Sequence, residues 1–113
     1  MTAPLASRQC KPCEGGVEPL PLAATQRLLE DVQGWELIEG KRLSKTITCK
    51  HFLDAVGLIQ RIAPIAEAED HHPDLHLRRY KHLTVELSTH AIGGLSENDF
   101  ILAAKIDQLL SPA

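Results

Sequence analysis

The sequence has few cysteines and aromatic residues, and it lacks long runs of apolar residues or of charges of one sign. Its three cysteines, Cys10, Cys13 and Cys49, cannot form a complete set of disulfides, which is typical of a reducing compartment. No segment approaches the roughly 20 apolar residues that cross a bilayer, and the N-terminus lacks the apolar stretch of a signal peptide. The net charge of -3 argues against nonspecific binding to nucleic acid or to an anionic membrane. We therefore expect a cytoplasmic protein.

One domain is expected from the length of the chain. Its 113 residues are 43% hydrophobic, which is enough for one ordinary core. Four of the seven prolines and the Gly15-Gly16 pair fall within residues 1–21, and both residue types interrupt helices and strands. We therefore predict an irregular leader over residues 1–21 and a folded domain over residues 22–113.

The predicted leader contains two cysteines, Cys10 and Cys13, at the Cys-x-x-Cys spacing that metal and redox sites use. A structural zinc site normally has four ligands, and only Cys49 and His51 could complete the set. No βαβ pattern follows that would indicate a thioredoxin-like motif. Two interpretations therefore stay open: a metal or redox role, or a reduced segment with neither.

The period of the apolar residues changes along the chain and predicts both helices and strands. Helices are predicted over residues 22–32 and 50–67, and a third follows a Ser96–Asp99 capping pair and runs to Leu110. Strands are predicted over residues 35–38, 42–48, 74–78 and 82–88, where apolar and polar residues alternate. The order α-β-β-α-β-β-α predicts an α+β fold, in which three helices pack on one face of a four-stranded antiparallel sheet.

Two adjacent histidines, His71 and His72, lie between the second helix and the third strand, and Pro73 follows them. A histidine cluster suggests proton transfer or metal binding, because the charge of histidine changes near neutral pH. Proline disfavours the α conformation at the preceding residue, so we expect an extended backbone here. Neighbouring side chains of an extended segment point to opposite sides. This geometry argues against one metal ion bound by both imidazoles.

A third histidine, His90, is expected at the end of the fourth strand. If the third and fourth strands form a hairpin, the start of one lies beside the end of the other. His71 and His72 would then lie near His90, and the three imidazoles would share one cleft. The alternative is that each is a solvated loop histidine, which is the default expectation for His51, His76 and His82.

Several short motifs are spread over residues 22–110. They are Glu67-Ala-Glu-Asp-His71-His72-Pro73, Tyr80, Leu87-Ser-Thr-His90 and Gly94-Leu-Ser-Glu-Asn-Asp99, together with Gly34-Trp35 and Phe52-x-x-Ala55. This set resembles the signature of the pterin-4a-carbinolamine dehydratases. The resemblance implies an α+β fold, a homotetramer built from dimers, and no metal or organic cofactor. It also implies a reaction, the removal of water from 4a-hydroxytetrahydropterin to give quinonoid dihydropterin.

The resemblance also implies roles for individual residues. It assigns acid/base catalysis to His71, His72 and His90, and pterin binding, partly through backbone groups, to Asp70, Ser88, Thr89 and Ala91. By the same resemblance, Glu67 and Asp99 orient the histidines or tune their charge. The chemistry agrees independently, because dehydration of a carbinolamine needs one proton given to the departing hydroxyl and one taken from the adjacent ring nitrogen. The sequence does not say which histidine gives and which takes.

Two other functions stay open. Relatives with this fold also serve as a dimerisation cofactor of a transcription factor or as an assembly chaperone, so the chain could be a binding module without catalysis. Alternatively, the substrate could be another pterin, linked to molybdenum cofactor metabolism. The retained histidines favour catalysis. The expected partners are therefore a small-molecule pterin and further copies of the chain, as a dimer or tetramer, and neither nucleic acid nor a membrane.

Overall fold

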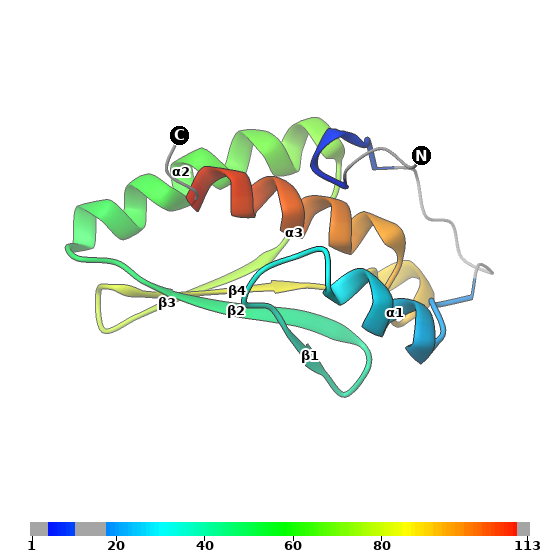
Figure 1. Cartoon of the computed structure of the whole chain (residues 1–113). Helices are drawn as coiled ribbons and strands as arrows, with labels where there is room; N and C mark the ends of the chain where they lie inside the picture. The colour runs from blue at the N-terminus through cyan, green and yellow to red at the C-terminus, as the bar shows by residue number, and fades with distance from the viewer. Residues whose placement is uncertain (1–4, 11–17, 111–113) are drawn as a thin grey trace.

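The computed structural model describes residues 5–10 and 18–110. Its helices are α1 (Leu22–Leu29), α2 (Phe52–Glu69) and α3 (Glu97–Leu110), with short 3-10 turns η1 (Leu5–Ser7) and η2 (His90–Ile92). Its strands are β1 (Glu36–Ile38), β2 (Arg42–Thr48), β3 (Asp74–Arg78) and β4 (His82–Leu87). Figure 1 shows the helices on one side of the sheet, with α2 and α3 lying side by side over it. The predicted α+β fold is confirmed.

The four strands form one antiparallel sheet in the order β1-β2-β4-β3. Leu83, Val85 and Leu87 of β4 are fully buried, as expected for alternate residues that face a core. They belong to a hydrophobic cluster that includes Ile62 of α2 and Phe100 of α3. The sheet therefore supports the two long helices, whose ends position the loops described below.

Most element bounds agree with the sequence prediction, and the differences have local causes. The strands over residues 42–48 and 74–78 are found as predicted. The second helix is displaced by two residues, because His51 and Asp54 form its capping box and Asp70 ends it in the left-handed conformation at φ 50°. The first helix stops at Leu29 rather than at residue 32. None of the helices in the described part of the chain is long and apolar enough to cross a membrane.

Residues 5–10 belong to the predicted irregular leader, yet they pack against the domain. They contain η1, and the side chain of Leu5 is only 6% exposed within the core cluster. Contacts between η1 and α3 join the first and last elements of the described chain. The rest of the leader up to residue 17, including Cys13, lies outside the described residues.

Candidate active site

A cavity of about 540 Å³ lies where α2 ends and where the chain leaves β4. Because β3 and β4 pair in antiparallel register, with Asp74 opposite Glu86, the residues before β3 lie beside the residues after β4. The cavity is lined by every residue to which the family resemblance assigned catalysis or pterin binding: Asp70, His71, His72, Ser88, Thr89, His90 and Ala91. The structure thus brings these residues together, and their roles stay predictions.

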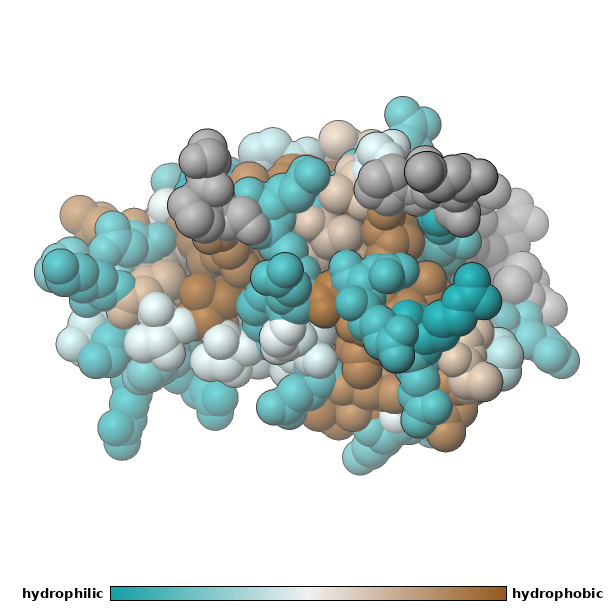
Figure 2. Space-filling model, viewed as in Figure 1, coloured by the Kyte–Doolittle hydropathy of each residue, from teal (hydrophilic) through white to brown (hydrophobic). Residues whose placement is uncertain are grey.

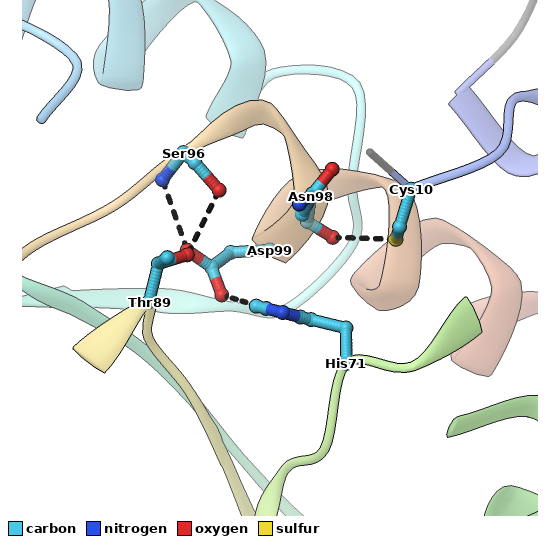
Figure 3. Close-up of polar contacts among 6 residues, drawn as sticks. All are labelled: Cys10, His71, Thr89, Ser96, Asn98 and Asp99. Carbon is cyan, nitrogen blue, oxygen red and sulfur yellow. Dashed lines mark hydrogen bonds and ion pairs between the residues drawn. The ribbon is translucent and has the colours of Figure 1, made fainter. Parts of the chain in front are cut away.

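His71 points to a buried carboxylate at the start of α3. Its Nε2 lies 2.6 Å from Oδ1 of Asp99, whose side chain is fully buried. The other oxygen, Oδ2, accepts hydrogen bonds from the Thr89 hydroxyl at 2.8 Å and from the Ser96 backbone N–H at 3.0 Å. Figure 3 shows these side chains converging on Asp99. Because a carboxylate oxygen can only accept, this hydrogen bond requires the His71 proton on Nε2, so that Nδ1 of the neutral imidazole carries the lone pair.

The carboxylate of Asp99 also caps the N-terminus of α3, as the Ser96–Asp99 pair in the sequence predicted. Its bond to the Ser96 N–H satisfies a donor that the helix itself cannot pair. Thr89 gives its hydroxyl proton to Asp99, so the Ser96 hydroxyl must donate to Thr89 across their 2.8 Å contact. Helix capping and the orientation of His71 therefore depend on one carboxylate.

His72 points the other way, as expected for neighbours on an extended backbone. Its Nε2 lies 2.7 Å from Oε1 of Glu67, and both side chains are largely exposed. The two signature carboxylates thus each contact one histidine. The prediction that His90 ends the fourth strand is wrong, because β4 ends at Leu87 and His90 begins η2, where its side chain is exposed.

The remaining histidines lie elsewhere. His76 contacts Glu86 at 3.2 Å, and His82 contacts Thr48 at 3.1 Å, both on the sheet. His51 caps α2. None of these three belongs to the lining of the cavity.

Sequence reasoning missed several residues of the cavity wall, above all Cys10 and Glu69. The backbone N–H of Cys10 donates to Oε1 of Glu69 at 2.6 Å, and its thiol donates to the backbone carbonyl of Asn98 at 3.6 Å. Burial, together with the nearby Glu69 carboxylate, raises the pKa of the Cys10 thiol to about 12. No periodic pattern signals this contact, because Cys10 and Asn98 are 88 residues apart.

A family model described as pterin 4 alpha carbinolamine dehydratase matches residues 18–109. The chain belongs to this family. A Nitrosomonas eutropha protein that carries the same family name is 49% identical over 107 residues, which are 94% of this chain and 93% of that protein. The mitochondrial pterin-4-alpha-carbinolamine dehydratase 2 of Arabidopsis thaliana is 43% identical over 95% of this chain and 59% of its own length.

The family fold has also been solved in a relative. The crystal structure of a transcriptional coactivator/pterin dehydratase from Brucella melitensis matches with a TM-score of 0.77 and 27% sequence identity. The match covers all of that chain but 83% of this one. Part of this dehydratase-family chain therefore has no counterpart in that structure.

Proposed function

We propose that this protein catalyses the dehydration of 4a-hydroxytetrahydropterin to quinonoid dihydropterin, as a cytoplasmic step in tetrahydrobiopterin recycling. Membership of the dehydratase family supports the reaction class. The observation that carries the proposal is that His71, His72 and His90 line one cavity while a buried carboxylate orients one of them. In this reaction the 4a-hydroxyl takes up a proton and leaves as water, and the adjacent ring nitrogen loses a proton as the carbon–nitrogen double bond forms.

The hydrogen bonds support different roles for the histidines, with His71 as the base and another histidine as the acid. Neutral His71 has its Nε2 proton directed to Asp99, so its Nδ1 lone pair suits the removal of the ring N–H proton. The imidazolium formed in that step is stabilised by the adjacent carboxylate. Proton delivery to the leaving hydroxyl then falls to His72 or His90, the exposed histidines of the cavity. Positioned acid and base groups each contribute about 10²- to 10⁴-fold in rate.

The direct test is a stopped-flow assay on synthetic 4a-hydroxytetrahydropterin. We expect the wild-type protein to accelerate loss of water well beyond the spontaneous rate and the His72→Ala variant to do so less. A wild-type rate equal to the spontaneous one, with protein shown to be folded, would reject the proposal. Running the same assay with other 4a-hydroxypterins, including those related to molybdenum cofactor metabolism, identifies the preferred substrate.

A second candidate function is that of a binding module, since the Brucella relative is also named a transcriptional coactivator. Phe52 and Leu53 at the start of α2 are 51% and 79% exposed, and Figure 2 shows apolar residues at that end of the molecule. Exposed apolar side chains of this kind suit a protein partner. Loss of partner binding in Leu53→Ser, without loss of dehydration, would separate the two functions.

Activity is expected to survive exhaustive chelation. Across residues 5–10 and 18–110 there is no group of at least three His, Cys, Asp or Glu side chains able to hold a metal ion. His71 and His72 are directed to different carboxylates, and the proposed proton transfers need only imidazoles. The dehydration rate after treatment with EDTA and a thiol-competing chelator measures this. Activity that disappears and returns with one equivalent of zinc would contradict it and support the Cys10–Cys13 metal interpretation.

A further inference from the structure

The segment from Leu5 to Cys10 is attached to the domain by both apolar and polar contacts. Leu5 is buried within the core cluster. Lys105 donates a hydrogen bond to the Ala6 carbonyl at 2.9 Å, and Arg8 pairs with Glu97 at 2.6 Å. These contacts hold the segment along α3, so its last residue, Cys10, has a defined position.

Glu69 connects this segment to the end of α2. Its side chain is only 12% exposed, and Oε1 accepts the Cys10 N–H at 2.6 Å. The other oxygen, Oε2, lies 3.9 Å from the Lys105 ammonium. Because Lys105 also binds the Ala6 carbonyl, one ion pair joins α2, α3 and the segment. Glu69 is two residues from His71 in the sequence, so this connection lies directly beside the histidines.

Cys10 therefore reaches the same cavity as His71, His72 and His90. The family model begins at residue 18, so Cys10 lies N-terminal to the residues that the model matches. Burial raises the pKa of the Cys10 thiol, so at neutral pH the side chain is an uncharged, weakly polar group. A wall of this kind suits the flat ring of a pterin better than it suits a charged group.

We propose that Cys10, at the end of the segment over residues 5–10, forms part of the wall of the pterin cavity and contacts the bound pterin, and that Glu69 is the residue that positions it. This inference rests on the proposed function, because it assumes that a pterin occupies the cavity. It adds to the histidine site a specificity element that lies N-terminal to the residues matched by the family model.

The first test measures whether a bound pterin shields Cys10. In a protein that carries Cys13→Ser and Cys49→Ser, Cys10 is the remaining thiol, and its reaction with methyl methanethiosulfonate at pH 8.5 can be followed by mass spectrometry. A dihydropterin that cannot undergo dehydration, added at ten times its dissociation constant, is expected to slow the reaction about 10-fold by simple occupancy. Cys49 is the matched control, because it lies next to Thr48, which pairs with His82 at the opposite end of β4 from the cavity. The protein that retains only Cys49 should show no protection.

The second test examines Glu69. We expect Glu69→Ala to raise KM about 10-fold with little change in kcat. The variant loses the carboxylate that holds Cys10 in place, whereas the three histidines of the cavity are unchanged. Glu69→Gln, which retains an oxygen to accept the Cys10 N–H, should restore most of the KM. Cys49→Ala should leave both constants unchanged. A structural role alone would lower the unfolding temperature of Glu69→Ala without this KM-specific effect.

The outcomes separate this inference from the proposed reaction. Protection of Cys10 without dehydration would support the wall and reject the reaction. Dehydration without protection, and with an unchanged KM in Glu69→Ala, would overturn the wall and leave the reaction standing. A protein that neither binds nor dehydrates any pterin would reject both.

Discussion

Replacing Asp99 with asparagine is expected to lower the dehydration rate by up to about 10⁴-fold, the size of effect found when a catalytic histidine is held in the wrong tautomer. The amide oxygen of asparagine can still accept the Thr89 hydroxyl and the Ser96 N–H. Its NH₂ group then faces Nε2 of His71, which must accept and not donate. The imidazole proton moves to Nδ1, so the nitrogen proposed as the base is blocked.

Asp107→Asn is the matched control for this prediction. Asp107 also belongs to α3 and is only 15% exposed, and it accepts hydrogen bonds from Trp35 and Lys45, away from the cavity. Asp107→Asn should lose stability, by about 1–3 kcal/mol for a buried donor left without a partner, because its NH₂ group must face either the Gln33 N–H or the Trp35 and Lys45 donors. Asp99→Asn can pair with all of its neighbours and should lose less, and thermal unfolding measures both. Only Asp99→Asn should lose dehydration activity. Equal activities in the two variants would show that Asp99 does not act through the tautomer of His71.

Removal of single histidines from the cavity is expected to reduce turnover about 10²-fold or more, as for any true proton donor or acceptor. We expect the largest loss for His71→Ala, and a smaller loss for His72→Ala or His90→Ala where the other imidazole or water substitutes. Stopped-flow dehydration rates compare the three variants. Double variants should lose less than the product of the single losses, because groups that act together are not additive.

The same variants differ in stability, which provides an internal check. His72 and His90 are exposed, so their removal should change the free energy of unfolding by about 0.5 kcal/mol or less. His71→Ala instead leaves the fully buried Asp99 without one of its partners, and we expect a measurable destabilisation. His76→Ala and His82→Ala are the activity controls. If all three cavity variants kept wild-type rates and lost binding to a protein partner, the binding module would replace the enzyme as the function.

Much of this fold could be predicted from short-range sequence patterns. The alternation of apolar and polar residues predicted β2 and β3, because one face of each strand packs on the core. The Ser96–Asp99 capping pair predicted the start of α3. The meeting of His71 with His90 followed from hairpin pairing alone. The same reasoning recognised Asp99 as a cap without showing from spacing that it would also bind His71, since that contact spans 28 residues.

The N-terminal wall could not be predicted in this way. Proline and glycine in residues 1–21 hide any period, and the contacts of Leu5 and Cys10 depend on a surface that exists only after α2 and α3 have packed. The buried Thr84 is a smaller case of the same kind. In the alternating pattern of residues 82–88, Thr84 falls on the polar face, yet it is 8% exposed and shares a 2.8 Å hydrogen bond with Thr46 of the neighbouring strand.

The attachment of Cys10 to Asn98 also constrains the order in which the molecule is assembled. The contact closes a loop of 88 residues. The conformational entropy lost in closing it is offset only if other stabilising contacts form at the same time. During synthesis the segment that carries Leu5 and Cys10 leaves the ribosome before α1, α2 and α3, and α3, the surface that receives it, is the last described helix to emerge. The cavity therefore cannot be complete until α3 has been synthesised, and a nascent chain that stops before α3 has neither the attached wall nor Asp99.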